Sequence, residues 1–352
     1  MAESLNEGFM RRAIRLSRRG FPMPNPHVGC VIARDGEVVG EGWHSYAGGL
    51  HAEAVALSQA GELARESDVY VTLEPCNHHG RTPPCAEALI AAGIRRVFVA
   101  VSDPNPVAAG GTSALREAGI EVEVGLLQDE ARAANRVWLS ALEMQRPFVT
   151  LKAAITLDGK IARADGTSKW ITGEPARRDG HRLRAEMGCV VVGANTVLAD
   201  DPLLTARIRG VTNQPLRVVL DARSRLSGEE RVFGEGNVLW IREELEPEEL
   251  LRQLWGWGVR GVLVEGGGET LRRFLVSGLA DRLCLYVGPK VFGEGISWVG
   301  SGLDVPEDLG LTLGSVRRFG QDFRIEYEIS QKSREQSDPD WRQNKQRSFP
   351  PS

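Results

Sequence analysis

The chain has 352 residues, 42% of them hydrophobic and 26% charged, which is enough for two ordinary globular domains. Its formal net charge of −4 argues against a nucleic-acid partner, because such proteins usually carry a basic surface. No stretch approaches the roughly 20 apolar residues of a membrane span, and the first residues lack the features of a signal peptide. Five cysteines make a poor disulfide framework, so we expect a cytoplasmic protein without a membrane partner.

The first half of the chain alternates between helical and strand patterns. Helices are predicted over residues 3–19, 51–60, 84–92 and 112–118, and strands over 28–33, 37–43, 69–73, 97–101 and 120–124. Asp35-Gly36 lies between the first two strands and is typical of a hairpin turn. This alternation predicts helices that cover a mixed or parallel sheet. A connecting helix over 128–145 then leads to a domain boundary, which places a first domain at residues 1–146.

A second α/β pattern occupies residues 147–330. Strands are predicted over 148–151, 189–192, 216–220, 238–241, 262–264, 283–287 and 323–329, and helices over 175–187, 248–256 and 269–278. Residues 331–352 are polar, contain prolines and show no apolar periodicity. They are therefore predicted to be a disordered tail, with a partner-binding segment as the alternative.

A metal site is indicated by His51-Ala52-Glu53, which Cys76 and Cys85 follow along the chain. Zinc binds imidazole and thiolate readily, and a catalytic zinc keeps one position open for a water whose pKa it lowers. Zinc deaminases of nucleobases carry the pattern H-x-E…P-C-x-x-C, in which the Glu moves protons. Here eight residues separate the two cysteines instead of two. The alternative is that these residues fill a core or a loop.

The predicted elements place His51 and Cys85 at the starts of two helices. Helix N-termini favour negative charge, so a Cys85 thiolate would be stabilised there. Glu53 lies early in the His51 helix, near enough to reach a metal-bound water. We therefore expect the two helix starts to face each other beside one sheet edge.

The second half carries a candidate phosphate site in residues 262–270, where a strand runs into Gly266-Gly267-Gly268 and then a helix. Backbone amides at such a turn bind phosphate, although a tight structural turn gives the same pattern. Arg184 and Arg207 are candidates for a substrate phosphate, because guanidinium groups bind phosphate through paired hydrogen bonds. For either arginine alone, an ordinary surface charge is the alternative.

Over about residues 5–330 the chain resembles the bifunctional riboflavin-biosynthesis deaminase/reductase family. The resemblance is carried by Asn25-Pro26-His27-Val28-Gly29, His51-Ala52-Glu53, residues 72–85, Leu157-Asp158-Gly159, residues 168–172, residues 196–202 and Glu265-Gly266-Gly267-Gly268. The long spacing between Cys76 and Cys85 is the form that this family uses. The resemblance implies a cytidine-deaminase-like three-layer domain followed by a dihydrofolate-reductase-like α/β domain.

The resemblance also implies two reactions. Zinc hydroxide would deaminate a 2,5-diamino-6-(5-phosphoribosylamino)pyrimidin-4-one, and NADPH would then reduce the ribosyl group of the resulting 5-amino-6-(5-phosphoribosylamino)uracil to ribityl. No proton donor for the second step is obvious, and Asp200 and Glu265 are the candidates.

By resemblance, each half receives a set of site residues. In the first half the metal ligands are His51, Cys76 and Cys85, the proton shuttle is Glu53, and the substrate contacts are Asn25, His44, His78 and Arg81. In the second half the NADP contacts are Ala154, Trp170, Thr196, Asp200, Gly267, Gly268, Glu269, Thr270, Leu271, Arg272 and Arg273, and the substrate contacts are Ser168, Arg184, Leu204, Arg207 and Glu265.

Two other functions share parts of these patterns. A tRNA-type zinc deaminase has the same metal motif but predicts a basic surface and no cofactor domain. A non-catalytic binding protein with a structural zinc would close the site with a fourth ligand, His78 or His79. The oligomeric state is left open, with a homo-oligomer as one expectation.

Overall fold

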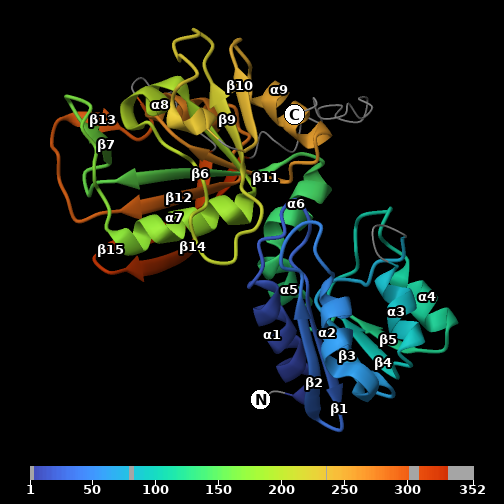
Figure 1. Ribbon diagram of the computed structural model, residues 1–352. Helices are drawn as coiled ribbons and strands as arrows, with labels where there is room; N and C mark the ends of the chain where they lie inside the picture. The colour runs from blue at the N-terminus through green and yellow to red at the C-terminus, as the bar shows by residue number, and fades with distance from the viewer. Residues whose placement is uncertain (1–3, 79–82, 235, 301–308, 332–352) are drawn as a thin grey trace. The chain divides into compact units, whose positions relative to one another are not determined.

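The computed structural model describes residues 4–78, 83–234, 236–300 and 309–331. The chain divides into two compact units, one of residues 1–143 with 210–213, and one of residues 144–209 with 214–352 (Figure 1). Apart from Gln331, the predicted tail lies outside the described residues. No helix within the described ranges combines the length and the apolar character that crossing a membrane requires.

The described part of the first unit forms a five-stranded sheet in the order β2-β1-β3-β4-β5. The strands are β1 (Gly29–Arg34), β2 (Glu37–Trp43), β3 (Asp68–Val71), β4 (Arg96–Val99) and β5 (Glu121–Val124). The helices are α1 (Leu5–Ser17), α2 (Ala52–Ala60), the 3-10 turn η1 (Gly61–Ala64), α3 (Cys85–Ala91), α4 (Gly111–Glu117), α5 (Gln128–Ala134) and α6 (Arg136–Met144). Strand β1 runs antiparallel to both of its neighbours, whereas β3, β4 and β5 are parallel, so the sheet is mixed as predicted.

Helices α1 and α2 lie on opposite faces of this sheet, because they pack against residues that point in opposite directions. A Cβ on Gly29 would come within 2.0 Å of the Ala13 carbonyl oxygen in α1. Cys30 points the other way and pairs with Gly42, whose Cβ would come within 2.0 Å of the Ala52 carbonyl oxygen in α2. Glycine at position 42 therefore lets the start of α2, which carries the predicted metal motif, lie directly on the sheet.

The described part of the second unit contains an eight-stranded sheet in the order β10-β9-β8-β11-β6-β12-β15-β14 and a two-stranded sheet of β13 and β7. The strands are β6 (Phe148–Ile155), β7 (Lys160–Arg163), β8 (Cys189–Gly193), β9 (Leu216–Leu220), β10 (Val238–Ile241), β11 (Gly261–Glu265), β12 (Arg282–Val287), β13 (Gly295–Ser297), β14 (Leu309–Phe319) and β15 (Asp322–Gln331). The helices are α7 (Glu174–Met187), α8 (Ala194–Asp200), the 3-10 turn η2 (Arg231–Phe233), α9 (Pro247–Gly256) and α10 (Gly268–Val276).

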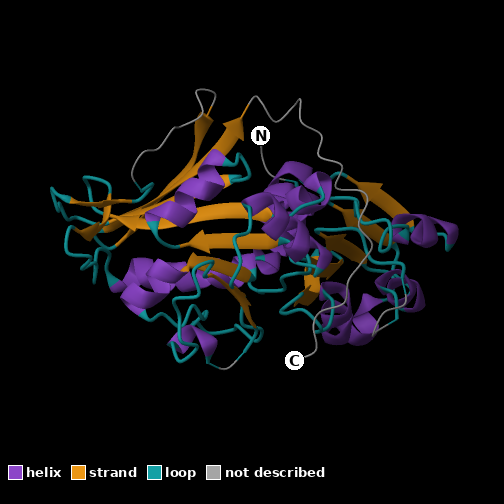
Figure 2. Cartoon of the chain, turned by 90° about the horizontal axis from the view of Figure 1, so that it is seen from above, coloured by secondary structure: helices purple, strands orange, loops and turns teal. Residues whose placement is uncertain are grey.

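Helices cover both faces of the large sheet, as Figure 2 shows. On β6, Val149 and Leu151 belong to the same buried cluster as Phe274 of α10. Thr150 points to the other face, where its hydroxyl lies 3.7 Å from the Met187 sulfur of α7. The strands from β10 to β12 are parallel, so their carboxyl ends meet at one edge, where such sheets place ligands.

Several elements differ from the sequence prediction, and the short strands β7 and β13 are among those that were not predicted. The single helix predicted over 128–145 is two helices, α5 and α6, separated at Asn135, whose side-chain oxygen accepts a hydrogen bond from the His27 amide. Helix α8 was not predicted, and its seven residues follow strand β8 without a loop between them. Strand β14 was not predicted either, since Gly310 and Gly314 interrupt its apolar alternation.

Candidate active sites

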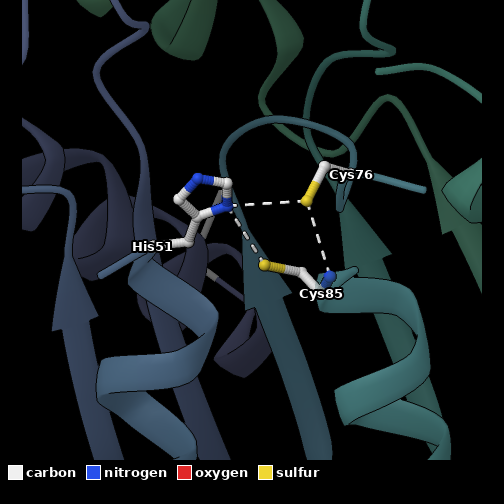
Figure 3. Close-up of side chains that lie close together, drawn as sticks. All are labelled: His51, Cys76 and Cys85. Carbon is white, nitrogen blue, oxygen red and sulfur yellow. Dashed lines mark hydrogen bonds between the residues drawn. The ribbon is translucent and has the colours of Figure 1, made fainter. Parts of the chain in front are cut away.

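His51, Cys76 and Cys85 converge at one point of the first unit, although three separate segments supply them. His51 caps the N-terminus of α2, Cys76 lies in the loop after β3, and Cys85 begins α3. Figure 3 shows the three side chains turned toward one another, with the His51 Nδ1 atom 3.3 Å from the Cys85 sulfur and 3.5 Å from the Cys76 sulfur. The predicted placement of both helix starts is therefore confirmed.

These separations fit a zinc ion. Zinc–nitrogen bonds of about 2.1 Å and zinc–sulfur bonds of about 2.3 Å in a tetrahedral arrangement place nitrogen and sulfur about 3.6 Å apart. The three ligand atoms lie within 4.8 Å of one another, and among the described residues no further His, Cys, Asp or Glu joins this cluster. The donor set is thus that of an open, three-ligand site.

The electrostatics of the two thiols also indicate a cation. Hydrogen bonds from the Cys85 thiol and from His51 hold the pKa of Cys76 well below its ordinary value. The same hydrogen bond and burial raise the pKa of Cys85, because a second thiolate would lie beside the first. Two thiolates can share this buried space only if a positive charge lies between them, as a divalent metal ion provides.

Glu53 lies in the first turn of α2 and is only 3% exposed. Burial raises its pKa to about 7, against the opposing effect of the nearby His51. A carboxyl group with a pKa close to the ambient pH both accepts and donates protons, which is the property of a general acid and base.

The structure describes three of the four other substrate contacts predicted in the first unit, Asn25, His44 and His78. The Asn25 amide nitrogen lies 3.1 Å from His44 Nε2, and the two imidazole rings of His44 and His51 are 5.4 Å apart. His78 follows Cys76 closely and is partly buried, and its Nδ1 atom has no hydrogen-bond partner among the described residues. Arg81 lies outside the described residues.

In the second unit, a buried ion pair lies at the carboxyl end of β11. Glu265 binds Arg184 of α7 through two hydrogen bonds of 2.6 Å and 2.8 Å, and the Lys152 ammonium lies 3.7 Å from the same carboxylate. Glu265 and Lys152 are in register on the parallel strands β11 and β6, so both point to the face that α7 covers. Burial raises the pKa of Glu265, but Arg184 and Lys152 outweigh it and bring the value to about 2.

Thr205 connects this pair to Arg207, which was predicted as a substrate contact, and to His181, which was not. Its carbonyl oxygen accepts a hydrogen bond from Arg184 and lies 3.0 Å from His181 Nδ1, and its hydroxyl accepts one from Arg207. Leu204, which precedes it, is buried and has a positive φ of 55°. Arg184 and Arg207 therefore lie close together, as a phosphate site requires.

The glycine turn forms a second polar centre. The Gly267 amide donates a 2.7 Å hydrogen bond to the hydroxyl of Thr196 in α8, and the following residue begins α10. Helix α10 is nine residues long and places the positive end of its dipole at this turn, which favours an anion. Of the residues predicted on α10, Thr270 and Leu271 are buried, while Glu269 pairs with Arg272, and Arg273 donates to the Leu245 carbonyl.

Of the remaining predicted contacts, Ser168 and Asp200 lie close together at the end of α8. The Ser168 hydroxyl is 3.5 Å from the Asp200 carboxylate, and the Lys169 ammonium is 3.8 Å from it. Trp170 is exposed, with the Arg177 guanidinium 4.5 Å from the centre of its ring. Ala154 lies on β6, in register with Tyr286 of β12.

Sequence reasoning missed Thr205 and the role of Lys152 beside Glu265. Thr205 acts largely through its carbonyl oxygen, which no residue type reveals. The register of β6 against β11 gives the only signal for Lys152, because it places the ammonium next to Glu265.

Comparison with known proteins gives matches over both units. The family model of the RibD C-terminal domain matches residues 147–325, and the model of the cytidine and deoxycytidylate deaminase zinc-binding region matches residues 3–101. The riboflavin biosynthesis protein RibD of Aquifex aeolicus is 40% identical over 92% of this chain and 99% of its own length.

The chain belongs to the RibD family.

Other RibD proteins extend this result. The Escherichia coli protein is 41% identical over 82% of this chain and 89% of its own. The solved structure of Acinetobacter baumannii RibD in form 1 has a TM-score of 0.85 at 40% identity, and covers 93% of this chain and 99% of that one. A structure from Thermotoga maritima, named as a diaminohydroxyphosphoribosylaminopyrimidine deaminase/5-amino-6-(5-phosphoribosylamino)uracil reductase, has a TM-score of 0.83 at 37% identity, with the same two coverages.

Membership of the RibD family establishes what kind of enzyme this is. It is a bifunctional deaminase and reductase of riboflavin biosynthesis, with a cytidine-deaminase-like domain and a RibD reductase domain. Its cofactors are zinc and NADPH, and its substrates are small pyrimidines. The fold class, the two activities and both cofactors predicted from the sequence are thereby confirmed.

The ion pair at Glu265 predicts a pH-dependent stability. A carboxyl group whose pKa falls from about 4.3 in the unfolded chain to about 2 in the folded one adds stability that is fully present above the unfolded value. That stability is lost as the pH falls through the folded value. We expect this group to lower the free energy of unfolding by about 3 kcal/mol between about pH 5 and pH 2.

Urea unfolding across this range provides the measurement, with Glu265→Gln as the comparison. The variant is less stable at neutral pH, and its free energy of unfolding depends less on pH in this range. An identical pH dependence in the two proteins would contradict the prediction.

Proposed function

We propose that the first unit deaminates 2,5-diamino-6-(5-phosphoribosylamino)pyrimidin-4-one and that the second reduces the ribosyl group of the product to ribityl. The observation that carries the proposal is the open His51, Cys76 and Cys85 cluster with Glu53 buried beside it. The name of the Thermotoga maritima relative supports the choice of substrates. In this proposal residues 1–146 are the deaminase domain and residues 147–330 the reductase domain.

In the deaminase step, His51, Cys76 and Cys85 hold the zinc, which when bound acts as a Lewis acid and makes water nucleophilic at neutral pH. Glu53 accepts a proton from the attacking water and gives it to the departing amino group. A C–O bond forms at the ring carbon, the C–N bond breaks, and ammonia leaves. Asn25, His44, His78 and Arg81 are proposed to bind the pyrimidine and its substituents.

In the reductase step, NADPH supplies a hydride to C1′ of the opened ribosyl group. Gly267 and Gly268 at the start of α10 are proposed to line the pyrophosphate site of the cofactor, with the Gly268 amide as the donor, because the Gly267 amide already donates to the Thr196 hydroxyl that holds the turn. The other proposed cofactor contacts are Ala154, Trp170, Asp200 and the α10 residues Glu269, Thr270, Leu271, Arg272 and Arg273. Their support is the family resemblance, and Asp200 and the α10 residues also lie on the two helices beside this turn.

Arg184 and Arg207 are proposed to bind the substrate phosphate, and Ser168, Leu204 and Glu265 complete the substrate set. With a pKa of about 2, Glu265 holds no proton at neutral pH, which disfavours it as the proton donor of the reduction. Asp200 therefore remains the proposed donor of the two candidates.

The competing functions have less support. The net charge of −4 disfavours a nucleic-acid substrate, so we propose that the enzyme acts on small molecules only. His78 does not join the metal cluster, which disfavours it as the fourth ligand of a closed structural site, and His79 lies outside the described residues. All five cysteines are free, and a cysteine binds zinc only in its reduced form. Both points support a reducing, cytoplasmic location. A homo-oligomer stays a prediction.

A coupled assay tests the proposed function. Ammonia release and NADPH oxidation are measured on the diamino substrate, and NADPH oxidation alone on the deaminated product. We expect equal amounts of ammonia and oxidised NADPH from the first substrate, and no ammonia from the second. Failure of the purified enzyme to release ammonia from the diamino substrate would overturn the proposal for the first unit.

Thr196→Val tests the glycine turn. Valine has the shape of threonine but accepts no hydrogen bond, so the Gly267 amide loses its partner at a cost of about 1–3 kcal/mol. We expect the Kd for NADPH to rise about tenfold, measured by fluorescence titration. The matched control is Thr167→Val, because that hydroxyl bonds only Asp165 in an exposed turn. Equal NADPH affinity in both variants would rule out this role of Thr196.

A further inference from the structure

Glu74 is a buried carboxylate in the deaminase unit with an unusual number of partners. It lies two residues before Cys76, is 7% exposed, and accepts four hydrogen bonds. One oxygen accepts from the Gly110 amide at 3.1 Å, the Thr112 amide at 3.0 Å and the Thr112 hydroxyl at 2.8 Å. The other oxygen accepts from the Asp103 amide at 3.1 Å. All four donors belong to the segment of residues 103–112.

These bonds hold segment 103–112 against the turn that carries Cys76. The Asn77 amide donates a 3.0 Å hydrogen bond to the Ala108 carbonyl oxygen. A Cβ on Gly111 would lie 1.8 Å from the Pro75 carbonyl oxygen, so the two backbones touch on both sides of Cys76. Segment 103–112 therefore forms a wall next to the metal ligand.

The wall also brings polar groups to the site. The Asp103 carboxylate lies within electrostatic reach of Cys76 and His78, and it accepts a 2.8 Å hydrogen bond from the Asn105 amide. Because its own amide bonds to Glu74, the position of Asp103 depends on that carboxylate.

We propose that Glu74 is a positioning residue of the deaminase, which fixes segment 103–112 as a wall of the pyrimidine pocket beside Cys76. This inference rests on the deaminase function proposed above. A carboxylate suits the task because both of its oxygens accept hydrogen bonds. Glutamine has the same shape, but its amide nitrogen is a donor and would oppose one of the backbone amides. The wall would then lose its fixed position while the three metal ligands stay unchanged.

The test is steady-state deamination by the full-length, zinc-loaded Glu74→Gln enzyme. We expect KM for the diamino substrate to rise about tenfold and kcat to stay within about twofold, with an unchanged zinc content per chain. NADPH oxidation with the deaminated product stays at the wild-type rate and reports on the integrity of the second unit. Wild-type ammonia release tests the proposed function separately.

Two further variants keep the test decisive. Thr112→Val removes one of the four bonds and leaves the carboxylate in place, so KM should rise by about two- to threefold with kcat unchanged. Glu117→Gln changes an exposed glutamate of α4 and should leave both constants unchanged. Loss of zinc from Glu74→Gln would overturn the proposal, since Glu74 would then support the metal ligands instead. An unchanged KM in Glu74→Gln, or in Thr112→Val if Glu74→Gln fails to fold, would overturn it as well.

Discussion

Glu53→Gln is expected to lower kcat for deamination by about 10²- to 10⁴-fold while the zinc content and the reductase activity stay unchanged. Glu53 is buried, and burial brings its pKa to about 7, so it is suited to move a proton between water and the leaving amino group. An amide of the same size fills the same space, but it neither accepts nor releases a proton at this pH. The measurement is ammonia release in parallel with zinc analysis.

The matched control for this variant is Glu62→Gln, which changes an exposed glutamate of η1 shortly after the same helix. That variant should deaminate at the wild-type rate. Normal turnover by a zinc-loaded Glu53→Gln enzyme would remove Glu53 from the mechanism. Loss of zinc in this variant would instead show that the carboxylate supports the metal ligands.

Arg184→Gln is expected to lower the free energy of unfolding of the second unit by about 3–5 kcal/mol and to remove most of the reductase activity. The substitution leaves the Glu265 carboxylate buried, with the Lys152 ammonium at 3.7 Å and the nearby His181 to oppose its charge. It also removes a cation from the proposed phosphate site. Denaturant unfolding of the full-length enzyme and NADPH oxidation with the deaminated substrate measure the two effects.

The control for Arg184 is Arg182, two residues earlier on the same helix. Arg182 forms a surface pair with Glu186, so Arg182→Gln should cost only about 0.3–0.5 kcal/mol and keep the activity. The double variant Arg184→Gln/Glu265→Gln should regain part of the lost stability, because no unpaired carboxylate stays buried, but none of the activity. If Arg184→Gln were as stable and as active as Arg182→Gln, the ion pair would have neither role.

Most of the fold follows from the sequence because the local patterns agree with the final packing. Most strands of the two large sheets are apolar runs of four to eight residues bounded by turn signals, and most of these were located within a few residues. The local sequence pattern did not predict elements whose structure depends on tertiary contacts. Strand β14 lies at the sheet edge, and its alternation is broken by glycines and by a bulge between Leu313 and Ser315.

The candidate metal site was also accessible from the sequence, since His51, Cys76 and Cys85 have distinctive side chains and two of them begin helices. Side chains that act by supporting the backbone were not. Glu74 lies within the motif of residues 72–85 and Thr205 follows Leu204, but their roles depend on hydrogen bonds with residues that lie many positions away in the sequence. Such contacts form only when the chain folds, so the type of a residue does not predict them.

The turn between the two zinc-binding cysteines is closed at its base. The Cys85 amide donates to the Cys76 sulfur at 3.4 Å, and the Ala86 amide donates to the Cys76 carbonyl at 3.2 Å. The positions of both sulfur atoms are thus independent of the number of residues that link them, and lengthening a loop costs only about 0.6 kcal/mol per doubling. This chain therefore carries eight residues between Cys76 and Cys85 at little cost to the positions of the two sulfur atoms.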